Sequence, residues 1–188
     1  MLFRSSAARR LAAGGQRPVR VVLIGGGEPN VELRAQLDAI AASSSERARI
    51  EVELTGSIPN PRMYAYYRAA DAYVSASEHE GFGIPLAEAM AFEVPVIAAA
   101  NAAVPETMGG TGILVPHWDD VAVAEAIAQI VDRPAWRDDI IRRQVRNLDR
   151  FSAATLRGRL HDLAAFLRDG RPSAAIVSSD HLLSVSAS

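Results

Sequence analysis

The sequence predicts an α/β fold built on a doubly wound, largely parallel sheet. Short β-branched runs alternate along the chain with longer stretches whose apolar residues have helical spacing. Glycine, proline and asparagine stand between these segments, where turns are needed. Apolar residues make up 49% of the 188 residues, which is enough for a continuous core in one domain. Repeated strand–helix alternation is typical of parallel sheets covered by helices.

The first predicted strand is Val19–Ile24, a run that ends at the triple glycine 25–27. We interpret this triplet as a strand-end turn, because a dinucleotide fingerprint needs a third glycine where the chain has Asn30. Asn30 instead caps a predicted helix that continues to Ala42. The second predicted strand is Ile50–Leu54, followed by a glycine turn.

The middle of the chain predicts a helix, a strand, a loop and a second helix. Asn60 is the expected N-cap of the first helix, because Pro61 fits the first helical position. A strand over Asp71–Ala76, a loop over Glu78–Gly83 and a helix from Ile84 to Phe92 follow. The tyrosines here are interpreted as packing residues of helix and strand: Tyr64, Tyr66, Tyr67 and Tyr73.

The rest of the chain predicts two more strands and three helices. The strands are Pro95–Ala98 and Gly112–Val115. Asp119 or Asp120 caps the next helix. The three helices are Val121–Val131, Pro134–Leu148 and Ser152–Arg168.

Ligands of such sheets bind beyond the carboxyl ends of the strands. The loops expected at that edge are Gly25–Pro29, Gly56–Asn60, Ser77–Gly83 and Ala99–Val104.

Composition and charge exclude several classes of function. The net charge is −2 and there is no long basic run, which argues against a nucleic-acid partner. The chain has no cysteine, so disulfide scaffolds and thiolate metal sites are excluded, and a reducing cytoplasm is the expected location. No apolar run approaches the roughly 20 residues of a membrane-spanning helix. No residues have metal-ligand spacing, and we expect no metal site.

The segment that carries chemistry is Glu78–Ala91, EHEGFGIPLAEAMA. It follows a predicted strand and opens a helix, where unpaired amides and the helix dipole form a ready site for phosphate. Gly81 and Gly83 let the backbone approach a ligand closely. Glu80 and Glu88 flank these glycines, and carboxylates are good acceptors for sugar hydroxyls. The pattern therefore indicates a nucleotide diphosphate sugar as the ligand.

These residues resemble the Glu-x7-Glu signature of glycosyltransferase family 4, because seven residues separate Glu80 from Glu88. Further segments resemble that family in the same order: YAYYRAADAY at 64–73, PVIA at 95–98 with Pro105-Glu106, GGTGILVP at 109–116 and DRFS at 149–152. The resemblance implies the donor-binding, C-terminal Rossmann-like half of a GT-B fold. It therefore implies three regions, namely a remnant of a helix at 1–18, the nucleotide-sugar-binding domain at 19–170 and a disordered tail at 171–188.

The resemblance also implies a role for each residue of the motif. Glu80 would contact the transferred sugar near its reacting carbon, as the catalytic residue. Gly81, Phe82 and Gly83 would offer backbone amides to sugar hydroxyls and phosphate.

At the start of the following helix, Ile84 and Leu86 would add amides near the diphosphate. Glu88 would bind the ribose hydroxyls, and Ile58 and Asn60 would lie near the base.

The implied reaction retains anomeric configuration and needs no metal or other cofactor. The expected donor is a UDP- or GDP-sugar, and amides and side chains would stabilise an oxocarbenium-like transition state. A separate N-terminal half would bind the acceptor, and that half is the candidate for peripheral association with a membrane.

Two departures from the family pattern bear on activity. The family's first strand and loop carry Gly-Arg and, further on, Lys, and nothing in this sequence matches them. We therefore expect weak or no transfer by the isolated chain. The alternatives are a catalytically inactive nucleotide-sugar-binding remnant and a GT-B nucleotide-sugar epimerase. The family often has glycine where this chain has Glu93, and glycine at that turn would permit a positive φ.

Overall fold

The computed structural model describes residues 18–25, 31–42, 50–79 and 81–169. The predicted helix remnant before residue 18, the loop around Asn30, the catalytic candidate Glu80 and the predicted disordered tail lie outside these residues. The structure divides into two compact units, Met1–Asn147 and Leu148–Ser188.

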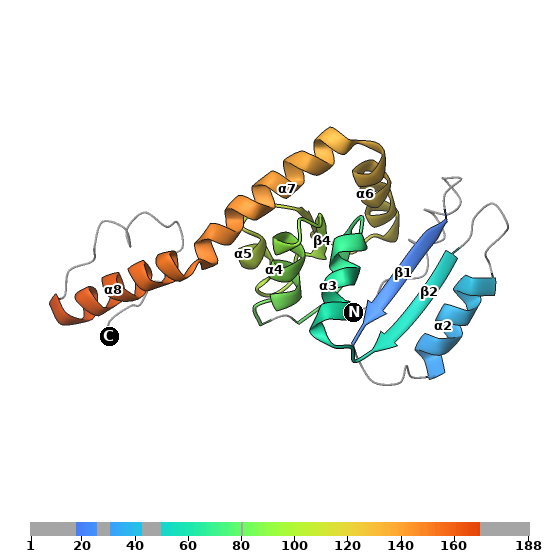
Figure 1. Cartoon of the computed structure of the whole chain (residues 1–188), viewed down its shortest axis with the longest axis horizontal. Helices are drawn as coiled ribbons and strands as arrows, with labels where there is room; N and C mark the ends of the chain where they lie inside the picture. Colours follow the sequence, from blue (N-terminus) through green and yellow to red (C-terminus); the bar gives the residue numbers. More distant parts are fainter. Residues whose placement is uncertain (1–17, 26–30, 43–49, 80, 170–188) are drawn as a thin grey trace. The chain divides into compact units, whose positions relative to one another are not determined.

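The first unit opens with the parallel strand pair β1 (Val19–Ile24) and β2 (Ile50–Gly56). The helix α2 (Val31–Ala42) connects these strands and packs beside β2 (Figure 1). A small apolar cluster fills this contact, with the buried Ile50 surrounded by Val19, Val21, Leu37 and Val52. The strand β1 has the predicted bounds, and β2 continues two residues beyond the predicted Leu54.

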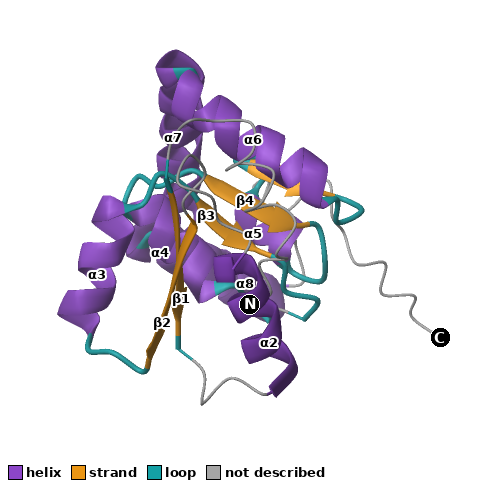
Figure 2. Cartoon of the chain, turned by 90° about the vertical axis from the view of Figure 1, so that its right-hand side faces the viewer, coloured by secondary structure: helices purple, strands orange, loops and turns teal. Residues whose placement is uncertain are grey.

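The other three strands form a second parallel sheet in the order β3-β4-β5. They are β3 (Tyr73–Ser75), β4 (Val96–Ala99) and β5 (Ile113–Val115), and helices surround them (Figure 2). The pairing is in register, with Ser75 opposite Ala98 and Ala98 opposite Leu114. The main core lies against this sheet and contains Val74, Ile97, Val115, Val123, Ala124, Ile130 and Ile140.

The described strands therefore form two parallel sheets instead of one continuous sheet. All five predicted strands are present and every observed pairing is parallel, as predicted. Sequence patterns identify strands by their local composition, but packing at long range decides which strands pair. That is why the strand count was predictable and the division of the sheet was not.

The helices of the first unit follow the predicted order. They are α3 (Asn60–Ala69), α4 (Ile84–Ala91), α5 (Val104–Met108), α6 (Asp120–Asp132) and α7 (Pro134–Leu148). Only α5 was not predicted, because its five residues are too few to show a helical period. Three of these residues, Val104, Thr107 and Met108, are buried.

Two helix caps test the sequence analysis directly. Asp119 caps α6 as predicted, since its side chain accepts a hydrogen bond of 2.8 Å from the amide of Val121. The prediction that Asn60 caps α3 is wrong, because Asn60 is already helical and the extended Pro59 occupies the cap position. Asn60 stands between Pro59 and Pro61 and is the first residue of the helix. Pro61 then lies within the first turn, where proline is tolerated because no hydrogen bond from its nitrogen is needed.

The second unit contains a short 3-10 helix, η1 (Asp149–Phe151), and the helix α8 (Ala153–Asp169). Ser152 stands between them, and its hydroxyl accepts a hydrogen bond of 3.1 Å from the amide of Thr155. This is the geometry of an N-cap, and it confirms the predicted start of the last helix.

Candidate functional site

The candidate site lies at the carboxyl edge of the strands. Because β3 and β4 pair in register, the loops that leave them begin at the same edge of the sheet. The first loop leads to α4 and carries the Gly-Phe-Gly sequence, and the second leads to α5. Both loops belong to the set predicted to face a ligand.

The turn into α4 requires glycine at position 83. Gly83 has a φ of 73° and occupies the N-cap of α4 in the left-handed region. A Cβ on Gly83 would lie 2.7 Å from Cδ1 of Leu86, so a side chain there would be strained by the positive φ and would require the Leu86 side chain to move. Gly81 is exposed, with open space around its Cα. The backbone therefore leaves room for a close approach at Gly81, whereas Gly83 is buried and its glycine serves the turn itself.

The amides of this turn are not equivalent. The amide of Leu86 donates to the carbonyl of Gly83 at 2.9 Å, and the Leu86 side chain is fully buried. That amide is engaged within the turn, and its expected place near a diphosphate stays a prediction. Ile84, the first residue of α4, has a side chain that is 63% exposed, so this position lies on the open side of the turn.

Polar contacts from α5 and α7 hold the Gly-Phe-Gly loop in place. The hydroxyl of Thr107 donates to the carbonyl of Phe82 at 2.6 Å, and Asn147 donates to the carbonyl of Thr107 at 2.9 Å. Thr107 and Asn147 are both buried, whereas the Phe82 ring is about half exposed. The loop is thus fixed from its inner side and open on its outer side.

Glu88 lies one turn into α4 and is half-buried. Its Oε2 accepts a hydrogen bond of 3.2 Å from the hydroxyl of Tyr67 on α3. Tyr67 was predicted to be a packing residue, and its ring does pack against Phe92 and Tyr73. The contact with Glu88 was missed, because an aromatic residue on an apolar helix face gives no local sign of a polar partner.

The loop between β2 and α3 carries the two residues expected near the base. Ile58 is half-buried and Asn60 is exposed. The hydroxyl of Thr55 donates to the carbonyl of Leu23 at 3.3 Å, and the amide of Gly25 donates to the carbonyl of Gly56 at 2.9 Å. These bonds fix the end of β2 from which the loop departs.

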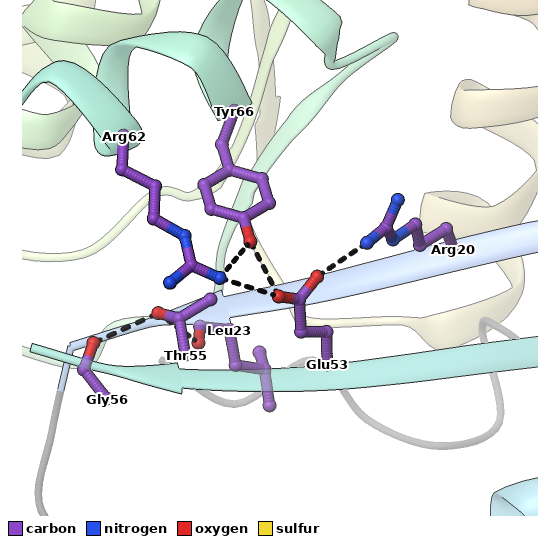
Figure 3. A network of polar contacts seen from close by, with 7 residues as sticks. All are labelled: Arg20, Leu23, Glu53, Thr55, Gly56, Arg62 and Tyr66. Atoms are coloured by element: carbon purple, nitrogen blue, oxygen red, sulfur yellow. Dashed lines mark hydrogen bonds and ion pairs between the residues drawn. The ribbon is translucent and has the colours of Figure 1, made fainter. Parts of the chain in front are cut away.

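A polar network fixes the other end of the same loop (Figure 3). The carboxylate of Glu53 on β2 accepts from the hydroxyl of Tyr66 at 2.6 Å and pairs with Arg20 at 2.8 Å and with Arg62 at 3.5 Å. The hydrogen bond from Tyr66, with the charges of the two arginines, lowers the pKa of Glu53. Since Tyr66 and Arg62 belong to α3, the network ties this helix to the strand before it.

The described residues bring together only part of the predicted site. Gly81, Phe82, Gly83 and Glu88 stand on one loop and the helix that it opens. Glu80 lies outside the described residues, so its role stays a prediction. The hydrogen bonds from Tyr67 to Glu88 and from Thr107 to Phe82 are seen in the structure and were not predicted from the sequence.

The described part of the chain contains neither a metal-binding cluster nor a membrane-spanning helix. No group of three or more His, Cys, Asp or Glu side chains there is arranged to hold a metal ion. No described helix combines the length and apolarity needed to cross a membrane.

The sequence matches the family described as "Glycosyl transferases group 1" over residues 2–133. The chain belongs to this family. D-inositol 3-phosphate glycosyltransferase 1 of Catenulispora acidiphila, a relative, is 33% identical over 133 residues, which cover 69% of this chain and 32% of that protein. The chain spans 26% to 34% of the length of the first curated relatives it matches.

Two solved glycosyltransferase structures show the same fold. The C-terminal domain of the group 1 family protein LpcC from Francisella tularensis has a TM-score of 0.64 and 24% identity, over 77% of this chain and 75% of that one. The pneumococcal O-GlcNAc transferase GtfA, in complex with UDP and GlcNAc, has a TM-score of 0.57 and 22% identity, over 84% of this chain and 32% of that one. The fold of this group 1 chain is that of a Rossmann-like half of a GT-B glycosyltransferase.

Proposed function

We propose that this chain is the donor-binding half of a retaining glycosyltransferase that uses a UDP- or GDP-sugar. Membership of the group 1 family supports the class of reaction. The UDP in the complex of the structurally similar GtfA supports a nucleotide diphosphate as the donor's leaving group. A separate half binds the acceptor in this proposal, since the chain spans about a third or less of its first curated relatives.

One observation carries the proposal. A left-handed glycine turn opens α4, and a carboxylate one turn further along the same helix is held by a hydrogen bond. Gly83 brings main-chain amides close to a diphosphate, where the positive end of the helix dipole favours negative charge. In this proposal Glu88 accepts hydrogen bonds from the ribose hydroxyls, and Glu80 acts on the transferred sugar.

In the proposed reaction the bond between the anomeric carbon and the diphosphate oxygen breaks, and the nucleoside diphosphate leaves with the electron pair. The acceptor oxygen forms its bond on the same face of the sugar, so configuration is retained, and its proton passes to the departing phosphate. The chain contributes amides aimed at the charge that develops in the transition state. Glu80 and Glu88 act on opposite parts of one ligand, unlike the paired carboxylates of glycoside hydrolases.

Substitution of Glu88 by alanine tests the site. We expect Glu88→Ala to lose about 1–3 kcal/mol of charged hydrogen bonding to the ribose. This corresponds to roughly a 5- to 150-fold increase in the Kd for UDP or GDP, measured by calorimetry.

Glu125→Ala is the matched control, because Glu125 lies on the exposed side of α6 and its contact is a surface hydrogen bond of 3.3 Å to Gln129. An equal loss of affinity in both variants, or none in Glu88→Ala, would remove Glu88 from the ribose site. A wild-type chain that binds neither UDP nor GDP would overturn the proposed function itself.

A further inference from the structure

We propose that Tyr67 is a positioning residue that sets the orientation of the Glu88 carboxylate and thereby the preference of this site for a ribose with both hydroxyls. The inference rests on the proposed function, because it assigns Glu88 to the ribose. It adds a residue from a different helix, which the sequence motif does not contain.

The position of the Tyr67 hydroxyl is fixed by packing. The side chain is 7% exposed, and its ring stacks on Phe92 with centroids 5.3 Å apart and an interplanar angle of 6°. Tyr73 lies on it at a tilt, with centroids 6.0 Å apart. Two aromatic neighbours and burial leave the ring little freedom.

The same surroundings keep Tyr67 a hydrogen-bond donor. Burial, followed by the neighbouring Tyr73 and Glu88, raises the pKa of Tyr67 well above its ordinary value. The hydroxyl therefore stays protonated across the working range of an enzyme. It donates to Oε2 of Glu88 at 3.2 Å, and the carbonyl of Pro85 lies 3.4 Å away as a longer second acceptor.

This donor restrains a side chain that would otherwise sample many rotamers. A glutamate loses considerable rotamer freedom when a ligand orders it, and a hydrogen bond made beforehand reduces that loss. Because Tyr67 engages Oε2, the orientation of Oε1 follows from the same contact. Among the described residues, Tyr67 is the one hydrogen-bond or ion-pair partner of the Glu88 side chain, so this contact sets the orientation of the carboxylate there.

A purely structural role for the tyrosine makes a different prediction. If Glu88 served only to satisfy a buried hydroxyl, loss of that hydroxyl would alter stability and leave ligand selectivity unchanged. If Tyr67 positions Glu88, loss of the tyrosine hydroxyl weakens the binding of only those ligands that carry the ribose hydroxyls. The ratio of the affinity for a ligand with the ribose hydroxyls to that for a ligand without them separates these two roles. A general loss of folded protein affects both affinities equally and cancels in this ratio.

Calorimetry with a matched pair of ligands, UDP and 2′,3′-dideoxy-UDP, tests the inference. We expect Tyr67→Phe to lower the affinity for UDP by about tenfold and to change that for the dideoxy analogue by less than about twofold. Tyr64→Phe is the matched control, because Tyr64 stands on the same helix with its ring 5.1 Å from Phe92. This control variant should keep the wild-type ratio.

A double-mutant cycle provides the second measurement. If Tyr67 acts through Glu88, Tyr67→Phe should have no further effect on UDP affinity in a Glu88→Ala background. A ratio that stays at the wild-type value in Tyr67→Phe, or additive losses in the double variant, would overturn the inference while leaving the proposed function in place. Failure of the wild-type chain to bind UDP and GDP would overturn both.

Discussion

Gln144 offers a sharp test of how the site is supported. This residue on α7 is fully buried, and its side chain spans the start of β4. Its Nε2 donates to the carbonyl of Val94 at 2.9 Å, and its Oε1 accepts from the amide of Val96 at 2.9 Å. One side chain thus satisfies two backbone groups beside the strand that leads to the ligand edge.

The perturbation is Gln144→Met, which keeps the length of the side chain and removes both polar atoms. Val94 and Val96 are themselves at most 2% exposed, so water cannot replace the lost partners without opening the core. Leaving one buried backbone group unsatisfied costs about 1–3 kcal/mol, so the two together cost roughly 2–6 kcal/mol. A typical total stability is only about 5–15 kcal/mol, so the variant should be severely destabilised.

Urea denaturation measures this free energy of unfolding. Gln129→Met is the control, because Gln129 makes a surface hydrogen bond of 3.3 Å to Glu125, and we expect a change below about 0.5 kcal/mol. A loss of less than about 1 kcal/mol in Gln144→Met would refute the reasoning, because it would mean that the two backbone groups do not depend on Gln144.

Gln144→Glu adds a pH-dependent version of the same test. The carboxylate can still accept from the amide of Val96, but only its protonated form can donate to the carbonyl of Val94. Folding therefore favours the protonated form and raises the pKa of this carboxyl, so the variant should gain stability relative to wild type as the pH falls. A difference that does not change with pH would contradict the assigned donor and acceptor.

Three further predictions use other described contacts. Glu93 has a φ of 60°, so Glu93→Gly should relieve about 1 kcal/mol of left-handed strain and raise the midpoint of urea unfolding; a lower midpoint would count against this strain. Thr107→Val removes the hydroxyl that donates to the Phe82 carbonyl, so chymotrypsin should cleave after Phe82 faster than in wild type; equal cleavage would show that this bond does not hold the loop. The pKa of Glu53 is lowered by its partners, so its contribution to stability is present at neutral pH and is lost as the pH falls through the folded-state value. Glu53→Gln should consequently flatten the acid side of the curve of Tm against pH, and an unchanged slope would exclude Glu53 as a source of acid sensitivity.

Much of the site's local geometry could be predicted from the sequence. Gly83 was expected to let the backbone approach a ligand closely, which stays a prediction, and its φ of 73° is one that glycine adopts without strain. Glu93 stands where the family often has glycine, and a positive φ was expected at this turn. The φ of 60° at Glu93 confirms that expectation. Both follow from the torsional preferences of single residues, which do not depend on distant parts of the chain.

The contacts that hold the site in place could not be predicted in this way. Tyr67 and Glu88 are 21 residues apart, and Thr107 and Phe82 are 25 apart. No periodic pattern links residues at such separations, because their meeting depends on how helices pack across the sheet. The role of Glu80 remains a prediction from the motif.

The sequence by itself determined the alternation of strands and helices, the parallel pairing and the glycine turn before Glu88. These features arise from residue spacing and backbone torsions, which act over a few neighbours. Only the tertiary structure decided that the strands divide into two sheets, that Gln144 spans the start of β4 and that Tyr67 meets Glu88. Buried polar groups must find partners wherever the packed chain places them, and this requirement selects pairs that no local pattern specifies.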